Sequence, residues 1–271
     1  MIRELTGVDR HMAFIRRLCA HPDFRDPMLC REAQLRRNLL DAHLDPANRI
    51  LGVFDGERLT GLFVFLVLED ERYVEMLAGL SDCPDAYAQL LPYLRGHYAG
   101  YRTDFVYNPK NRLLHGVLEQ AGAEFEPEQQ KLVLQNDVPC PPDSRVVPYS
   151  PVWRPAYLAM HTVDRYWTGE RVLAAPERFH VLLAMEDGAP AGYLDLSYGQ
   201  LENEPYDLFV RETSRRRGLG RALLARAVAL NRPNAMSLLV DVDNIAAIAL
   251  YESLGFVKAD DENNITASLL L

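Results

Sequence analysis

RRRGLGRALL, residues 215–224, places three arginines and two glycines directly before an apolar stretch with helical spacing. The strand-like run YDLFV (206–210) leads into it, and we expect a helix over 218–231. The first N–H groups of a helix have no partners inside the helix and carry partial positive charge. Glycine lets an anion approach such groups without meeting a Cβ atom. The stretch therefore predicts a loop that binds a phosphate or diphosphate group.

A second segment strengthens this interpretation. An arginine–glycine cluster can also decorate a solvated loop, and these residues fit neither GxxxxGK nor GxGxxG. However, DNIAAIALYESLGF (243–256) follows the predicted strand SLLVDV (237–242). Asn244 is placed to cap a helix, and Gly255 is placed to end it. The alanines between them make a thin helix that a ligand can approach closely, which favours a ligand site over a solvated loop.

The two segments together resemble the GCN5-related N-acetyltransferase (GNAT) family. The resemblance covers about residues 145–271, with the two motifs at the family's usual separation. The matching residues are Val210, Arg215, Gly218 and Gly220 in V-x4-R-x2-G-x-G, then Asn244, Ala247, Leu250, Tyr251, Gly255 and Phe256 in N-x2-A-x2-L-Y-x3-G-F. One departure is Glu212, where the family often has proline, and this affects loop rigidity more than chemistry.

The resemblance implies acetyl-CoA as cosubstrate and no metal. Main-chain amides over 215–221 would hold its pyrophosphate, and the strand 208–210 would diverge from 237–242 to pair with the pantetheine arm. An N–H of that strand would hold the acetyl carbonyl, a contact that strengthens as charge develops. The implied cofactor-binding residues are Leu208, Phe209, Val210, Arg215, Arg216, Arg217, Gly218, Leu219, Gly220, Arg221, Asn244, Ala247 and Tyr251.

The resemblance also gives Tyr251 a catalytic role facing the thioester sulfur. Ordinary pKa values are about 10 for tyrosine and about 8.5 for a thiol. We therefore expect Tyr251 to stabilise the leaving thiolate chiefly through a hydrogen bond, with proton transfer late or shared.

The group that takes the proton from the acceptor amine stays open. The predicted catalytic carboxylates are Glu202 and Glu204, followed by Asp195 and Asp207, although a carboxylate in such a position is more often an ordinary surface group. A water chain to solvent would also serve. The aromatic residues that either line the acceptor pocket or only pack are Tyr166, Trp167 and Tyr198.

The element order recurs along the chain. VLEQAGAEF (117–125) aligns with LYESLGFVK (250–258), so Gly122 falls on Gly255, and the same offset puts Asn111 on Asn244. We expect an α/β (α+β) fold of two tandem GNAT-like domains, each a mixed, mostly antiparallel sheet flanked by helices. The predicted domains are 1–137, a proline-dense linker with the first strand at 138–150, and a catalytic domain at 145–271.

The expected elements alternate between the two periodicities. Helices are predicted at 9–20, 28–44, 84–98, 109–121, 151–175, 218–231 and 244–254. Strands are predicted at 49–54, 59–69, 72–80, 104–107, 130–135, 179–186, 191–199, 206–210, 237–242, 256–258 and 265–271.

The first copy lacks the cofactor motif. Its counterpart of RRRGLG is DCPDAY (82–87), where both glycines are replaced and two carboxylates would meet the phosphates, and Leu118 stands at the Tyr251 position. A carboxylate about 4 Å from a phosphate costs roughly 1–4 kcal/mol. We expect no cofactor chemistry in this copy. The tandem layout with an inactive first half is similar to that of mycothiol synthases, which does not fix the acceptor.

Composition sets the remaining expectations. The 271 residues carry a formal net charge of −9, which argues against general nucleic-acid binding. There is no apolar run of about 20 residues and no secretory leader pattern, and the four cysteines show no metal-ligand spacing. We expect a cytoplasmic monomer or homodimer that moves an acetyl group to a primary amine of a small molecule or peptide by direct attack in a ternary complex. The alternative is a sensory or regulatory module that binds acyl-CoA without turnover.

Overall fold

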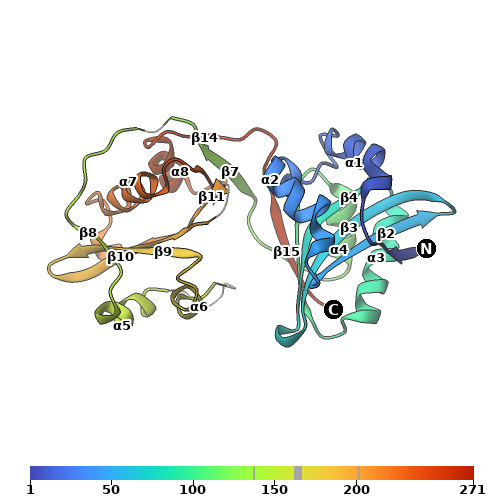
Figure 1. Cartoon of the computed structure of the whole chain (residues 1–271), viewed down its shortest axis with the longest axis horizontal. Helices are drawn as coiled ribbons and strands as arrows, with labels where there is room; N and C mark the ends of the chain where they lie inside the picture. Colours follow the sequence, from blue (N-terminus) through green and yellow to red (C-terminus); the bar gives the residue numbers. More distant parts are fainter. Residues whose placement is uncertain (137, 162–166, 200–201) are drawn as a thin grey trace. The chain divides into compact units, whose positions relative to one another are not determined.

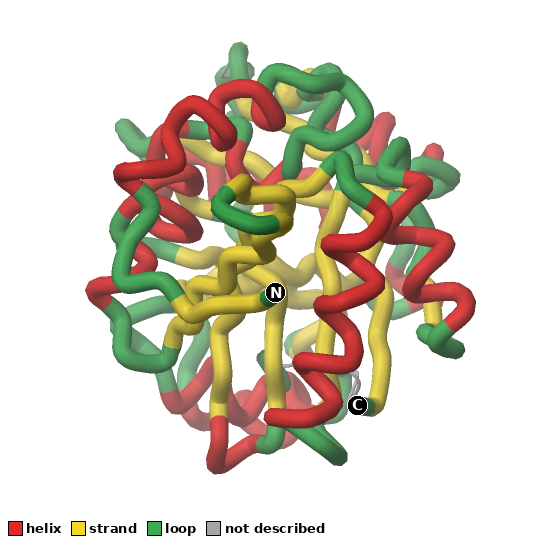
Figure 2. The backbone as a smooth tube through the Cα atoms, turned by 90° about the vertical axis from the view of Figure 1, so that its right-hand side faces the viewer, coloured by secondary structure: helices red, strands yellow, loops and turns green. Residues whose placement is uncertain are grey.

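The computed structural model describes residues 1–136, 138–161, 167–199 and 202–271. The chain divides into two compact units, one of residues 1–130 with 259–271 and one of residues 131–258. The divisions therefore fall at 130 and 258, and not at the proline-dense segment where the predicted domains meet. Both chain termini belong to the first unit, as Figure 2 marks.

The first unit contains a seven-stranded sheet in the order β1-β2-β3-β4-β5-β15-β6 (Figures 1 and 2). Its strands are β1 Ile2–Glu4, β2 Asn48–Asp55, β3 Arg58–Leu68, β4 Tyr73–Ser81, β5 Arg102–Tyr107, β6 Glu124–Phe125 and β15 Ile265–Leu270. Its helices are α1 Met12–Cys19, α2 Glu32–Leu35, α3 Pro84–His97 and α4 Arg112–Gln120. The pairs are antiparallel except for β4 with β5.

Both faces of this sheet are covered, so its central strands are buried on both sides. Phe63 and Phe65 pack with α3 and α4, while the alternate residues Leu62 and Val64 pack with the α1 side. The predicted helix 28–44 is wrong. That segment forms a helical run at 32–40 between two short 3-10 turns at 27–29 and 42–44, and the buried Asn38 links the run to the first turn by donating to the Met28 carbonyl at 3.2 Å.

The second unit contains two four-stranded sheets, in the orders β12-β10-β9-β8 and β11-β13-β7-β14. Their strands are β8 Val146–Pro148, β9 Phe179–Glu186, β10 Ala189–Ser197, β12 Pro205–Val210, β11 Glu202–Asn203, β13 Ala235–Asp241, β7 Gln129–Leu134 and β14 Phe256–Lys258. The helices are α5 Arg154–Leu158, α6 Gly169–Ala174, α7 Leu219–Asn231 and α8 Ile245–Glu252. The predicted first strand within 138–150 is thus β8.

The chain passes from one sheet of this unit to the other at Glu204. Before it, Asn203 in β11 pairs in parallel with Met236 in β13; after it, β12 pairs antiparallel with β10. β12 and β13 therefore belong to different sheets. This divergence leaves one edge of β12 open, as the resemblance implied for residues 208–210.

The last strand of each copy completes the other copy's sheet. β7, predicted to end the first domain, lies between β13 and β14 in the second unit. β15, predicted to end the second domain, lies between β5 and β6 in the first unit. The two strands occupy equivalent places in the two units. Each one joins the sheet of the unit that does not contain the strands directly before it in the sequence.

Local geometry repeats between the units where the alignment predicted it. Asn111 and Asn244 both accept a hydrogen bond from the main-chain N–H three residues later, which caps α4 and α8. Gly122 and Gly255 both adopt left-handed backbone, with φ of 81° and 94°. A Cβ at Gly255 would overlap the Asn136 carbonyl oxygen, so only glycine fits there.

Candidate active site

Unpaired main-chain donors gather at the start of α7. Arg216 and Gly218 have positive φ, 62° and 82°, so the chain turns sharply before the helix begins. The first bond of the helix runs from Ala222 N–H to the Gly218 carbonyl at 2.9 Å. In the described part of the chain, the N–H groups of residues 216–221 donate to no protein acceptor. These six donors lie at the positive end of a 13-residue helix, and we call them the amide cradle.

Arginine side chains surround the amide cradle. Arg145 donates to the Arg217 carbonyl at 3.2 Å, and Arg217 pairs with Glu186 at 2.9 Å. A Cβ built on Gly218 would meet only the Arg145 guanidinium, 3.8 Å away, so the space above it is free. The remaining arginines bind main-chain oxygens, Arg215 that of Val210 and Arg221 that of Ser253. Arg145 also pairs with Asp143 at 2.7 Å, so the Arg145 and Arg217 guanidinium groups are each matched by a carboxylate close to the amides. Arg145 is a contributor that the sequence did not reveal.

The open edge of β12 offers further donors. Arg211 N–H donates to the Ala191 carbonyl at 2.8 Å on the β10 side. Because donors alternate in direction along an antiparallel strand, Phe209 N–H also faces β10, and the N–H groups of Leu208 and Val210 face the open edge. These are the groups that the resemblance assigns to the pantetheine arm and the acetyl carbonyl.

α8 brings two of the predicted residues to the same sheet face as α7. Asn244 accepts from Ala247 N–H at 3.2 Å, which leaves its amide nitrogen exposed. Tyr251 is 8% exposed and packs in the core cluster that contains Leu219 and other α7 residues. Its ring meets that of Phe256 edge-on at 5.9 Å.

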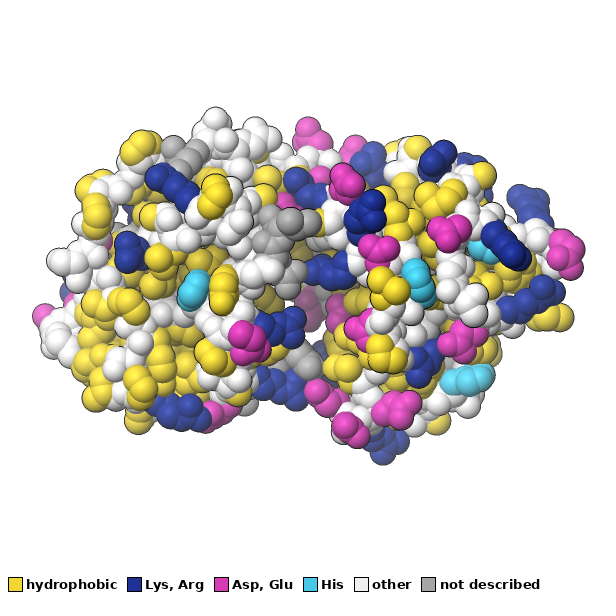
Figure 3. Space-filling model, in the orientation of Figure 1, with side chains coloured by type: hydrophobic (Ala, Val, Ile, Leu, Met, Phe, Trp, Pro, Cys, Tyr) yellow, Lys and Arg dark blue, Asp and Glu magenta, His cyan; other side chains and the backbone are white. Residues whose placement is uncertain are grey.

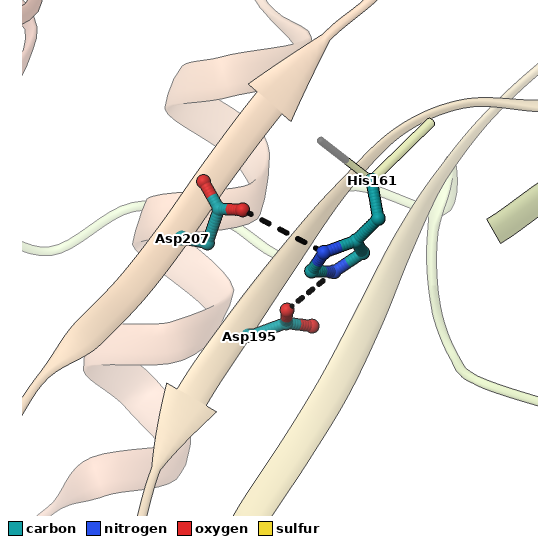
Figure 4. A group of neighbouring side chains, drawn as sticks. All are labelled: His161, Asp195 and Asp207. Atoms are coloured by element: carbon teal, nitrogen blue, oxygen red, sulfur yellow. Dashed lines mark hydrogen bonds and ion pairs between the residues drawn. The ribbon is translucent and has the colours of Figure 1, made fainter. Parts of the chain in front are cut away.

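The opposite face of the β12-β10 pair carries a polar cluster (Figure 4). Asp195 on β10 and Asp207 on β12 stand side by side, because these residues are register partners. His161 follows α5 and lies between them, with Nε2 at 2.8 Å from Asp195 Oδ2 and Nδ1 at 3.9 Å from Asp207 Oδ2. Tyr157 donates to Asp195 at 2.9 Å, and Tyr193 donates to Asp207 at 2.7 Å.

Burial sets the electrostatics of this cluster. The Asp195 side chain is fully buried, and burial raises its pKa against the lowering effect of His161 and Tyr157. Burial and the neighbouring Asp195 raise the pKa of Tyr157, which keeps its hydroxyl a donor. Asp207 is less enclosed, with a side-chain exposure of 16%. The cluster therefore has a sealed inner carboxylate and an outer one within reach of a ligand.

The other predicted carboxylates lie elsewhere. Glu202 pairs with the buried Lys131 ammonium at 3.4 Å. Glu204 lies at the break between β11 and β12, where its main-chain N–H donates to Ser197 Oγ at 2.7 Å.

Of the predicted aromatic residues, Tyr166 lies outside the described residues. Trp167 packs edge-on against Phe179, with the Arg178 guanidinium over its ring at 4.9 Å. Tyr198 is 39% exposed and stacks on His180.

Comparison with known proteins agrees with this geometry. Residues 145–256 match the Acetyltransferase (GNAT) family. The chain is similar to a tandem GNAT protein from the clavulanic acid biosynthesis pathway, with 14% identity over 99% of this chain and 98% of that one, and a TM-score of 0.58. No curated protein matches the sequence.

Two further solved structures share the fold. A GCN5-related N-acetyltransferase from Sphaerobacter thermophilus is 17% identical over 83% of this chain and 81% of its own, with a TM-score of 0.57. An acetyltransferase of the GNAT family from Colwellia psychrerythraea is 11% identical over the full length of both chains, with a TM-score of 0.51. At these identities the likeness shows the fold alone.

Two properties of the whole chain complete the description. No helix among the described residues is long and apolar enough to cross a membrane. Acidic and basic side chains are intermixed over the face drawn in Figure 3. The family match covers residues 145–256, which lie in the second unit, and the whole chain shares the fold of a tandem GNAT protein.

Proposed function

We propose that the second unit is an acetyl-CoA-dependent N-acyltransferase that moves the acetyl group to a primary amine by direct attack in a ternary complex. The observation that carries this proposal is the amide cradle at residues 216–221, whose six N–H groups have no acceptor in the described chain. A diphosphate is the part of coenzyme A that such a site would hold. Each hydrogen bond to a charged group contributes roughly 1.5–3 kcal/mol, so three or four suffice for micromolar affinity.

The rest of the cofactor would follow the open edge of β12. The outward N–H groups of Leu208 and Val210 suit the amides of the pantetheine arm, and Asn244 has an exposed amide nitrogen for the same arm. The acetyl carbonyl would then accept a main-chain N–H, which supports the oxyanion as the amine attacks.

Leaving group and nucleophile would lie on opposite faces of β12. Tyr251 belongs to the core on the α7 side, where it would donate a hydrogen bond to the departing sulfur. The polar cluster of Asp207 and His161 lies on the α5 side, from which the amine would approach. Glu204, at the break in the strand, is the other candidate base; Glu202 is less available because Lys131 pairs with it. No metal enters this proposal.

Two measurements test the proposal in sequence. Isothermal titration of the full chain with acetyl-CoA should give a micromolar Kd, with desulfo- and dephospho-analogues reporting which part binds. Incubation with acetyl-CoA and a panel of amines (tyramine, putrescine, lysine methyl ester) should then release free thiol. Binding without thiol release on any amine would favour a regulatory acyl-CoA module, and absence of binding would remove the proposal altogether.

Tyr251→Phe should lower kcat about 100-fold and leave acetyl-CoA affinity within about threefold, because the hydroxyl would act only when the thiolate leaves. Phenylalanine keeps the packing against Phe256. Steady-state kinetics and calorimetry on the same preparation check this result. Equal losses of kcat and of affinity would argue against the leaving-group role.

A further inference from the structure

We propose that Asp207, backed by His161 and Asp195, is the acceptor subsite, that it binds a cationic primary amine as its ammonium ion, and that it receives the proton which the amine must lose. This inference rests on the proposed function, since it assigns the partner of the acetyl group. It selects one carboxylate among those near the open strand.

The position of Asp207 supports the assignment. It directly precedes Leu208, whose N–H faces the open edge where the acetyl group would lie. Tyr193 binds Asp207 Oδ2, and in the described chain Oδ1 has no hydrogen-bond or ion-pair partner. Since the side chain is 16% exposed, an ammonium group can reach that oxygen without displacing a protein group.

His161 is oriented to accept a proton. An ionised carboxylate only accepts hydrogen bonds, so Asp195 fixes the proton of a neutral imidazole on Nε2. The unprotonated Nδ1 then faces Asp207, 3.9 Å from its Oδ2. Asp195 is in turn held by the hydroxyl of Tyr157. The arrangement places a base directly behind the carboxylate that meets the ammonium group.

Charge explains the preference for a cation. Two carboxyl groups face a single imidazole, so the acidic groups outnumber the basic one, and the three side chains are 0%, 5% and 16% exposed. A bound ammonium ion neutralises part of this charge, whereas a hydroxyl group of equal size does not. The substrate class is therefore a primary amine that is protonated in solution, and alcohols are excluded as competing acceptors.

The protons balance over the reaction. The ammonium ion passes one proton through Asp207 to His161 Nδ1, and the free amine attacks the thioester carbon. The C–S bond breaks, and the thiolate takes a proton from water or from Tyr251, which recovers it from solvent. The new amide nitrogen loses its second proton to solvent. His161 finally returns its proton to solvent, so acetyl-CoA and R–NH3⁺ give the amide, CoA–SH and one H⁺.

The same side chains are poorly placed for a metal ion. Three ligand atoms from His161, Asp195 and Asp207 can be chosen within 4.8 Å of one another. However, the two ring nitrogens face different carboxylates, as Figure 4 shows, and one ion cannot bind both edges of a single ring. Each carboxylate also already accepts a tyrosine hydroxyl. These donors suit proton transfer.

Asp207→Asn is the first test, because it keeps the shape and the Tyr193 hydrogen bond but removes the charge. We expect KM for tyramine, putrescine and lysine methyl ester to rise about tenfold or more, with acetyl-CoA affinity unchanged. Asp187→Asn removes the same charge from an exposed turn of the second unit and serves as the matched control. Glu204→Gln tests the competing carboxylate. Thermal melts establish that each variant is folded.

His161→Gln should lower kcat about 100-fold with a smaller change in amine KM. Long-range ¹H–¹⁵N spectra of histidine-labelled protein, assigned by this variant, should show the Nε2–H tautomer at His161. If His161 had only a structural role, the large loss of kcat and the Nε2–H tautomer would not be expected to occur together. An Nδ1–H tautomer would overturn the proton path.

The remaining outcomes separate this inference from the proposed function. Loss of acetyl-CoA binding in the wild-type protein would refute both. Normal acetyl-CoA binding with no acetylation of any amine in the panel would overturn both the ammonium subsite and the proposed transfer, and would leave only the cofactor site standing. Equal KM changes in Asp207→Asn and Asp187→Asn, or a larger one in Glu204→Gln, would also overturn the ammonium subsite.

Discussion

The strand pair β3–β4 of the first unit corresponds to the pair β10–β12 of the second, but the main-chain donors at its edge have different partners. In the first unit, Gly79 on β4 pairs with Phe63, as Leu208 on β12 pairs with Leu194 in the second. The N–H of Leu208 faces an open edge, whereas that of Gly79 donates to the buried Asp26 carboxyl at 2.6 Å. A side chain of the first unit thus occupies the place that an acetyl carbonyl would take in the second.

The helix start differs in the same sense. Tyr87 of α3 is fully buried; its hydroxyl donates to the Ser81 carbonyl at 2.9 Å and accepts from the Asn111 amide at 2.8 Å. The loop before α3 has satisfied donors, since Cys83 N–H binds Ser81 Oγ and Pro84 has no N–H. In the first unit, side chains pair with the groups that correspond to the amide cradle and the open strand edge, which adds to the predicted repulsion by two carboxylates.

The comparison shows how one fold loses a ligand while it keeps its shape. Caps, left-handed glycines and strand register are retained in both units, because they determine the backbone path. The donors that face the groove are free in one unit and paired in the other. Each prediction below either transfers a feature between the units or removes one.

The largest effect is expected from separating the halves. The fragment 145–271, the predicted catalytic domain, lacks β7, and its β15 has no β5 to pair with. We expect it to remain unfolded, because a central strand of the β11-β13-β7-β14 sheet is missing. Far-UV circular dichroism and amide NMR dispersion check this. The fragment 129–258 keeps both sheets and is the control; a folded 145–271 with the full chain's acetyl-CoA affinity would contradict the exchange.

The exchange of β7 and β15 shows which parts of the fold can be predicted from the sequence. Periodicity placed most strands and the principal helices, and the motif located the cradle, because these signals are local. The partner of β7 or β15 is not local: the two strands are equivalent, so either sheet accepts either one.

The polar cluster was hidden for a related reason. Asp195 and Asp207 meet only through the register of β10 with β12, and His161 reaches them from α5. Sequence analysis named both carboxylates as candidates but did not single out His161. Arg145 beside the cradle was missed because it comes from the segment taken as a linker.

Gly220→Tyr places in the second unit the tyrosine that the first unit has at the equivalent position, Tyr87. A Cβ at Gly220 would lie 3.4 Å from Leu250 and 3.8 Å from Val210, so it points toward α8 and the end of β12 at normal contact distance. The tyrosine would fill the groove as Tyr87 does, and we expect acetyl-CoA affinity to fall at least about 100-fold. Gly220→Ala is the control and should lose only about threefold. Calorimetry measures the Kd for acetyl-CoA. A tyrosine variant that keeps this affinity within threefold would show that a side chain at residue 220 does not block the cofactor.

Asp26→Asn replaces the buried carboxyl group that binds Gly79 N–H in the first unit with an uncharged amide. Burial raises the pKa of Asp26 to about 7, despite the hydrogen bonds from Gly79 and Met28. The folded state therefore binds more protons than the unfolded state between about pH 4 and pH 7, so this group's contribution to stability falls as pH rises through that window. The free energy of unfolding should fall by about 2 kcal/mol from pH 5 to pH 7 on this account.

The variant should lose that pH dependence, because an amide does not titrate in this range. Its single oxygen can replace only one of the two carboxyl oxygens that accept from Met28 N–H and Gly79 N–H, so its stability should also be lower at every pH. Urea unfolding at several pH values measures the difference between wild type and variant. Asp70→Asn, at an exposed position, controls for net charge. Parallel pH profiles for the wild type and Asp26→Asn would show that the carboxyl is not the titrating group.

The smallest effect separates the two roles of the capping asparagines. Serine also caps a helix but has no amide nitrogen to donate. Asn244→Ser should keep stability within about 0.5 kcal/mol and weaken acetyl-CoA binding about fivefold, because only the donor to the cofactor is lost. Asn111→Ser should do the reverse: it leaves the buried Tyr87 hydroxyl without its donor, lowers stability by about 1–2 kcal/mol and leaves Kd unchanged. Urea unfolding and calorimetry on both variants give the four values. If the two substitutions change affinity and stability by the same amounts, both asparagines act only as helix caps. The Asn111–Tyr87 hydrogen bond of the first unit would then have no counterpart in a contact between Asn244 and the cofactor.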